Sequence, residues 1–208
     1  MKLRVHALAT ALGLTVPADL DARCLALHAL LLRHNARTNL VGDARLDAFV
    51  AHLHEALVAA AVARALLGRD PLRVLDVGAG AGLEALLFAL SFPAAHVVAV
   101  EPRAKRAVFI ELAADSVGAR QLHVIARPLA EARLVPDFDI VTSRAVWPPL
   151  QWLAQARPYA ARDGVVLAHV ATGSPPLPGE AKRQDVPGAY EHSVVGVRVG
   201  AAAPKPVG

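Results

Sequence analysis

One short segment restricts the fold of this chain more than any other. Residues 74–82 read VLDVGAGAG, an apolar run that ends in three glycines at alternate positions. This pattern is typical of a β-strand that turns tightly into a helix, because glycine adopts backbone conformations closed to other residues. A helical pattern follows at once in Leu83–Leu90. We therefore expect a strand–turn–helix unit in which a ligand can approach the main chain of the turn closely.

After this turn, short apolar runs alternate with segments of helical periodicity. Strands that alternate with helices predict βαβ units and a parallel sheet covered on both faces. We therefore expect an α/β protein with a Rossmann-like, doubly wound, mostly parallel sheet. Strands are predicted at Leu72–Val77, Val97–Val100, His123–Ala126, Asp139–Thr142, Val165–Val170 and Glu191–Val199, and helices at Leu83–Leu90, Ala104–Val117 and Pro149–Ala161.

The first 70 residues carry helical patterns only. One helix is predicted to open at Pro17 and to end near Asn35–Asn39, and a second to run from an N-cap at Asp43 to Leu67, before Gly68. We expect residues 1–70 to form a helical extension that caps the α/β domain and contacts the substrate. The α/β domain is expected at residues 71–200, and residues 201–208, rich in proline, are expected to be a disordered tail.

Composition excludes several classes of protein. The chain is 55% hydrophobic, with a mean hydropathy of +0.40, so it can bury a sizeable core and is no disordered polyelectrolyte. Arg64 and Pro93 interrupt the longest apolar runs, which fall short of the roughly 20 residues of a membrane span. The N-terminus lacks the apolar region of a signal peptide, and the single cysteine, Cys24, excludes an intrachain disulfide. We expect a soluble, cytoplasmic protein with no membrane partner.

The charge is mildly basic and spread along the chain. The formal net charge is +4, which divides into +2 in residues 1–70 (eight Lys/Arg against six Asp/Glu), zero in residues 71–150 (eight against eight) and +2 in residues 151–208 (six against four). Such a balance permits a nucleic-acid partner but does not require one.

A carboxylate follows the second predicted strand. Glu101 lies about 20 residues beyond the glycine turn, where an acid can accept hydrogen bonds from two ribose hydroxyls. The spacing G-x-G-x-G differs from the dinucleotide fingerprint G-x-G-x-x-G, which weighs against a bound pyrophosphate. The turn and the acid together predict a nucleoside-binding crevice at the carboxyl ends of the strands, with a purely structural turn as the alternative.

This combination resembles the S-adenosylmethionine site of class I methyltransferases, and further segments resemble one family with that fold. The family is GidB, also called RsmG, which methylates N7 of a guanosine in 16S ribosomal RNA. The segments occur in the family's order over roughly residues 20–173. They are Asn39-Leu40-Val41, His52-x-x-Glu55, Gly78-x-Gly80-Ala81-Gly82-Leu83, Glu101 with Lys105-Arg106-x-x-Phe109, and Ser143-Arg144-Ala145.

The resemblance implies S-adenosyl-L-methionine as cofactor and 16S rRNA of the small ribosomal subunit as partner. Cofactor contacts are expected from Gly78, Ala79, Gly80, Gly82, Leu83, Glu101, Pro102, Arg127, Pro128 and Arg144. RNA contacts are expected from Arg33, Arg37, Asn39, Lys105 and Arg106. No residue stands out as a catalytic group, although Arg144 is a candidate positioning residue. Neutral guanine carries no proton on N7, so this reaction needs no general base.

The chain also departs from the family pattern. Glu84 places an acid near the cofactor cleft where the family usually has Pro-Gly, and Thr172-Gly173 stands where the family has Lys-Gly. Glu55 and Glu101 each replace an aspartate. Two alternatives therefore stay open. The chain could be a related methyltransferase with another substrate, such as a small molecule, or a cofactor-binding paralogue without activity.

Other conspicuous side chains have simpler interpretations. His52 is expected to make a structural hydrogen bond between the helical extension and the α/β domain. His52 and His54 lie two residues apart and do not share a helix face, so we expect no metal site. Cys24 and Phe109 are predicted core residues. Hydrophobic packing is expected for Trp147, with stacking on a base as the alternative.

Overall fold

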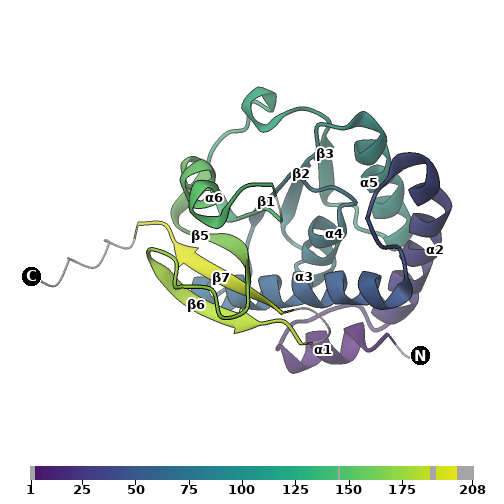
Figure 1. Ribbon diagram of the computed structural model, residues 1–208, viewed down its shortest axis with the longest axis horizontal. Coiled ribbons are helices and arrows are strands. Elements are labelled where there is room, and N and C mark those ends of the chain that lie inside the picture. Colours follow the sequence, from purple (N-terminus) through teal and green to yellow (C-terminus); the bar gives the residue numbers. More distant parts are fainter. Residues whose placement is uncertain (1–2, 145, 188–190, 201–208) are drawn as a thin grey trace, which may run out of the picture.

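The computed structural model describes residues 3–144, 146–187 and 191–200. Three helices come first along the chain and lie together at the lower and right edges of the view in Figure 1. They are α1 (Val5–Ala11), α2 (Leu20–Thr38) and α3 (Leu46–Leu67). The remaining helices are α4 (Leu83–Ser91), α5 (Ala104–Val117) and α6 (Pro149–Ala156), with short 3-10 turns at η1 (Leu129–Glu131) and η2 (Arg157–Tyr159).

Within the described residues, seven strands form one sheet in the order β3-β2-β1-β4-β5-β7-β6. They are β1 (Arg73–Val77), β2 (His96–Val100), β3 (Leu122–Ile125), β4 (Phe138–Thr142), β5 (Ala160–Ala171), β6 (Glu180–Asp185) and β7 (His192–Arg198). The first five strands are parallel, and β7 pairs antiparallel with both β5 and β6. The strand order reverses between β1 and β4, which is where open α/β sheets bind their ligands. The predicted doubly wound, mostly parallel sheet is confirmed.

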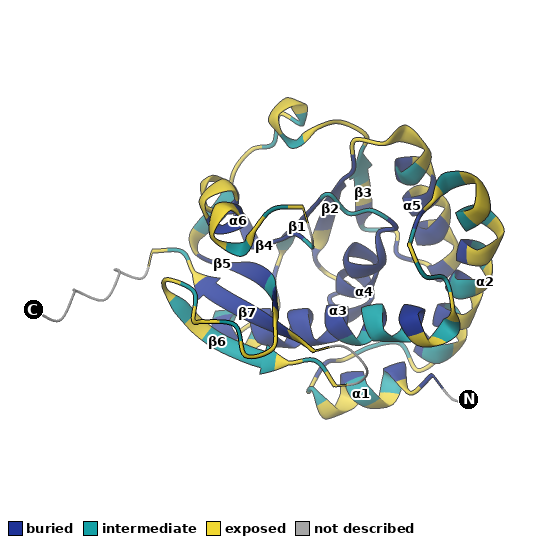
Figure 2. Ribbon diagram, in the orientation of Figure 1, coloured by how far each residue is buried: buried dark blue, intermediate teal, exposed yellow. Residues whose placement is uncertain are grey.

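Alternate residues of each strand pack into two separate cores, one on each face of the sheet. Val74 of β1 joins the core formed with α1–α5, whereas its neighbour Leu75 joins the core formed with α6. This follows from the two-residue period of a strand, which sends successive side chains to opposite faces. Figure 2 shows the result, with buried strands at the centre and helices that expose only their outer sides. Cys24 and Phe109 lie in the first core, as predicted.

Helix α3 is the most deeply buried of the long helices. By length and composition it could cross a membrane, but 67% of its most apolar 18-residue window is buried inside the fold. It packs against α4 and against β5, β6 and β7. Its apolar character is therefore explained by its place in the core of the protein.

Several predicted boundaries were wrong. The helix predicted to reach Ala161 ends at Ala156, because Pro158 has no N–H group to continue it, and β5 begins at Ala160. Helix α3 has its N-cap at Arg45 rather than Asp43, whose Oδ1 accepts the Arg45 N–H at 2.9 Å. Helix α1 and strand β6 were not predicted. The predicted tail at 201–208 lies outside the described residues, and the division near residue 70 stays a prediction.

Candidate functional site

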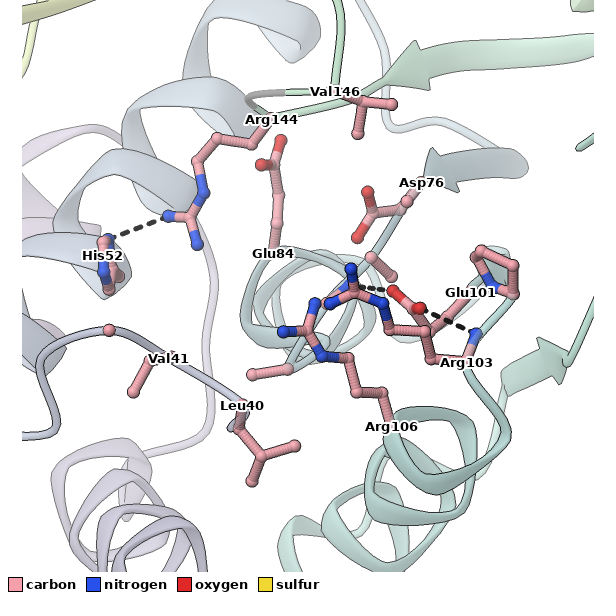
Figure 3. A pocket seen from close by; sticks show the side chains of 16 residues that line it. Leu40, Val41, His52, Asp76, Glu84, Glu101, Arg103, Arg106, Arg144 and Val146 are labelled. Atoms are coloured by element: carbon pink, nitrogen blue, oxygen red, sulfur yellow. Dashed lines mark hydrogen bonds between the residues drawn. The ribbon is translucent and has the colours of Figure 1, made fainter. Parts of the chain in front are cut away.

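A cleft of about 540 Å³ opens at the carboxyl ends of β1, β2 and β4. Figure 3 shows His52 and Arg144 on one side, Glu101 with Arg103 on the other, and Asp76 and Glu84 between them. Its lining residues come from the segment after α2, the glycine turn and the loops after β2 and β4, together with single side chains of α3, β1, α4 and α5. They are Leu40, Val41, Gly42, His52, Asp76, Gly78, Ala79, Gly80, Ala81, Glu84, Glu101, Pro102, Arg103, Arg106, Arg144 and Val146.

The three glycines of the turn share a backbone conformation, but Gly80 and Gly82 differ in their surroundings. All have positive φ angles, of 69° at Gly78, 61° at Gly80 and 71° at Gly82, which favours glycine at each position. A Cβ atom on Gly82 would lie 2.8 Å from Cγ1 of Ile110, so this glycine lets the turn pack closely on α5. A Cβ atom on Gly80 would meet nothing closer than the Gly78 carbonyl at 3.9 Å. Gly80 therefore leaves the main chain open to the cleft.

Glu101 is tied to the glycine turn by its carboxylate. Its Oε2 accepts the Gly80 N–H at 2.8 Å, and its Oε1 accepts the Arg103 N–H at 2.9 Å. The side chain is 3% exposed, yet it lines the cleft. Because each carboxylate oxygen has a second lone pair, both can still accept a hydrogen bond from a ligand. The arrangement suits a group that presents two neighbouring hydroxyls.

A buried network of charges lies beneath the cleft. His169 on β5 contacts two carboxylates, with Nδ1 at 2.7 Å from Oε1 of Glu55 and Nε2 at 3.2 Å from Oε1 of Glu84. Thr142 also donates to Oε1 of Glu84, at 2.7 Å. Burial by itself lowers the pKa of His169, but the two carboxylates raise it above its usual value. The pKa of Glu84 is lowered in spite of burial, chiefly by His169.

The same network reaches the mouth of the cleft through Arg144. Its Nη1 donates to Oε2 of Glu55 at 3.1 Å and to Nδ1 of His52 at 3.0 Å. The predicted link between the helical region and the sheet through His52 is thus confirmed. Burial raises the pKa of Glu55, but hydrogen bonds with His169 and His52 and the charge of Arg144 bring it below its usual value.

Asp76 is a deeply buried acid whose pKa is raised. It is 2% exposed and lines the cleft at the end of β1. Its Oδ2 atom is buried and has no hydrogen-bond partner among the described residues. Burial first, and the nearby charge of Glu84 second, raise the pKa of Asp76. This oxygen is therefore available to a donor group that enters the cleft.

The segment after α2 forms one side of the cleft mouth and is fixed in two ways. Oδ1 of Asn35 accepts the N–H groups of Leu40 and Val41, at 2.8 and 2.9 Å. Nη2 of Arg106 on α5 donates to the Asn39 carbonyl at 2.6 Å. Arg106 and Asn39, both predicted to contact RNA, therefore also contact each other.

A second cavity of about 390 Å³ adjoins the cleft and shares Gly78, Pro102 and Val146 with it. Its walls are mostly apolar and suit a flat ring. They comprise Val77, Gly78, Val100, Pro102, Pro128, Leu129, Ala130, Val146, Trp147, Gln155 and Tyr159. Trp147 stacks on the buried Trp152, with ring centroids 5.6 Å apart, in agreement with the predicted packing role.

The structure brings together most of the predicted cofactor residues but not all of them. Gly78, Ala79, Gly80, Glu101, Pro102 and Arg144 line the cleft, and Pro128 lines the adjoining cavity. Leu83 is buried in the core beside Gly82, and neither is among the residues that line the two cavities. Arg127 is exposed and lines neither cavity.

The predicted RNA residues are spread along one side of the protein. Arg106 lines the cleft itself, while Lys105 lines a shallow groove between α2 and α5. Arg33 and Arg37 are exposed in the last turns of α2. His169 and Arg103 were missed by the sequence analysis. A histidine within the apolar strand VVLAHVA was the one signal that could have drawn attention to the buried network.

A doubly wound sheet, an open glycine turn, an acid after β2 and a cleft at the strand-order reversal define a class I S-adenosylmethionine-dependent methyltransferase. Solved methyltransferases share this fold. Magnesium protoporphyrin IX methyltransferase from Synechocystis, solved with bound S-adenosylmethionine, superposes with a TM-score of 0.58 at 17% identity, over 83% of this chain and 97% of that one. A putative O-methyltransferase from Klebsiella pneumoniae gives 0.57 at 13% identity, over 84% and 90%.

The family model for GidB, rRNA small subunit methyltransferase G, matches residues 22–173. Ribosomal RNA small subunit methyltransferase G of Myxococcus xanthus is 36% identical over 162 residues, covering 76% of this chain and 72% of that protein. The protein of that name from Acidovorax is 35% identical over 176 residues, covering 78% and 76%. The chain belongs to the GidB family.

Proposed function

We propose that this protein transfers a methyl group from S-adenosyl-L-methionine to N7 of a guanosine in 16S rRNA, within the small ribosomal subunit. The observation that carries the proposal is the cleft that joins Glu101, Gly80 and Arg144 in a member of the GidB family. Because the small subunit is the proposed partner, the proposed location is the cytoplasm.

Three observations support S-adenosylmethionine as the occupant of the cleft. The main chain at Gly80 is open, Glu101 can accept from two ribose hydroxyls, and Oδ2 of Asp76 lacks a partner among the described residues. We assign the ribose to Glu101, the ammonium group of the methionine part to Asp76 and Glu84, and its carboxylate to Arg144. The adjoining apolar cavity at Pro128 is assigned to the adenine. The bound cofactor supplies an electrophilic methyl group on a sulfonium.

The chain's own contribution to the reaction is orientation. Guanine N7 has a free lone pair, so catalysis needs the two reactants to be held in line rather than a proton to be removed. Such positioning is worth about 7–11 kcal/mol in favourable intramolecular models. Residues around the cleft mouth, Val41 and Gly42 among them, are the groups that would hold the guanine against the cofactor.

The proposed RNA surface predicts a strong dependence of binding on salt. Each phosphate contact adds about 0.7–0.9 to the slope of log affinity against log salt concentration. Replacing both Arg33 and Arg37 by alanine should therefore lower that slope by about 1.5, measured by fluorescence anisotropy with a 16S rRNA fragment. The matched control replaces Arg120 and Arg162, which are exposed near the opposite ends of the strands. Equal slopes for the two double variants would contradict this RNA surface.

The activity itself is tested by mass spectrometry of 16S rRNA. A strain that lacks the gene should have no N7-methylguanosine at one position, and the purified protein with S-adenosylmethionine should restore it on that strain's small subunits. Normal methylation in the deletion strain would overturn the proposal. Cofactor binding without methyl transfer to RNA would instead favour the second candidate, a methyltransferase with another substrate, which the acid Glu84 in the cleft motivates.

A further inference from the structure

His169 is a buried histidine that faces two carboxylates at once. Its side chain is 6% exposed, and both ring nitrogens lie within hydrogen-bond distance of glutamate oxygens, those of Glu55 and Glu84. A ring that donates from both nitrogens is the charged imidazolium form. His169 thus places a positive charge between two glutamates that come from different helices, α3 and α4.

The two oxygens of Glu55 divide their contacts between His169 and Arg144. Oε1 lies 2.7 Å from His169, and Oε2 accepts from Nη1 of Arg144 at 3.1 Å. His169 therefore fixes the orientation of the Glu55 carboxylate through Oε1. The position of Oε2 in turn fixes the guanidinium of Arg144. His192 and His52 also face Glu55, at 3.8 and 4.0 Å.

Arg144 is held through one nitrogen and keeps the others for the cleft. Its hydrogen bonds with Glu55 and His52 both use Nη1. Within the described part of the chain, Nε and Nη2 form no hydrogen bond, while the residue lines the cleft. Those donors point to an acceptor that the protein does not supply, such as the carboxylate of a bound ligand.

We propose that His169 is a positioning residue, which fixes the guanidinium of Arg144 for the cofactor by holding Glu55 in place. The proposal rests on the function proposed above, in which Arg144 binds the cofactor carboxylate. His169 itself does not line the cleft and touches neither reactant. Its effect on binding must therefore pass through a neighbour that lines the cleft, either Arg144 by way of Glu55 or Glu84 directly. The proposal is the first of these routes, and the test separates the two.

The test is a double-mutant cycle on the affinity for S-adenosylhomocysteine, measured by calorimetry on the purified full-length protein. His169→Gln alone should weaken binding about tenfold, since one hydrogen bond to a charged group is misplaced. Arg144→Ala should weaken it at least as much. In the Arg144→Ala background, His169→Gln should then change the Kd by less than twofold. His123→Gln, at an exposed residue of the edge strand β3 that lines neither cavity, is the matched control, and it should leave the Kd within twofold.

Two results would overturn the inference: an unchanged Kd for His169→Gln, or a tenfold effect that persists without Arg144. If wild-type protein fails to bind S-adenosylhomocysteine, the proposed function falls as well, whereas wild-type binding without coupling removes only this inference. His169→Gln leaves two buried carboxylates facing each other, so the variant could fail to fold. The double variant His169→Gln with Glu84→Gln restores the charge balance, and the same cycle is run in the Glu84→Gln background.

Discussion

Glu101→Ala should weaken the affinity for S-adenosylmethionine by about a hundredfold or more. Each hydrogen bond to a charged acceptor contributes about 1.5–3 kcal/mol, and the carboxylate is assigned to two ribose hydroxyls. The change also removes the acceptor for the Gly80 N–H, which loosens the glycine turn. Titration calorimetry with S-adenosylmethionine measures the effect.

A control separates this site effect from a general loss of charge. Glu111→Ala removes an exposed carboxylate from α5 and should leave the affinity unchanged. Glu101→Gln keeps the shape but can direct an NH₂ group at the Gly80 N–H or the Arg103 N–H, so it should also bind weakly. Wild-type affinity in Glu101→Ala would remove the ribose assignment.

Gly82→Ala should destabilise the protein clearly more than the same substitution at Gly68. Both glycines have nearly equal φ angles, 71° and 70°, so the backbone strain of about 1–2 kcal/mol is the same for each. They differ in space, since a Cβ atom at Gly82 meets Ile110 at 2.8 Å, whereas one at Gly68 meets nothing within 4 Å. Overpacking of a tight core adds about 1–3 kcal/mol.

Thermal unfolding measures this difference directly. For a domain of this size, 1 kcal/mol shifts the Tm by about 2–4 °C, so Gly82→Ala should melt several degrees below Gly68→Ala. Equal Tm values would show that Ile110 moves aside without cost and that the close approach of the glycine turn to α5 is unimportant. Because Gly68 caps the far end of α3, its substitution also serves as the control for cofactor binding.

The sequence predicted the parallel part of the fold well because its strands are short, apolar and separated by clear helical patterns. Strand β6 escaped prediction for the opposite reason. Its sequence EAKRQD lies at the edge of the sheet, where charged residues are favoured and no apolar alternation is needed. Helix α6 was predicted too long because its apolar pattern continues into the next strand, and Pro158 alone marks the change.

The part of the cleft assigned to the cofactor was predicted, because its residues lie close together in the sequence. The glycine turn and Glu101 belong to adjacent βα units, so their spacing reveals them. The network of Glu55, Glu84 and His169 was not predictable in this way, since its members lie up to 114 residues apart and meet only through the folding of α3 onto the sheet. Glu84 was recognised as a departure from the family pattern, but the sequence did not identify His169 as the residue that neutralises it.

The buried network also limits the routes by which this chain can change during evolution. Removing one partner of a buried ion pair is far more damaging than replacing the whole group by apolar residues, because the remaining charge has no compensation. For the stability of the fold, substitutions at Glu84 and His169 are therefore expected to be strongly epistatic, each more destabilising alone than the two are together. A lineage is therefore expected to gain or lose Glu84 and His169 through paired substitutions. The presence of both residues would then mark a distinct branch of the family.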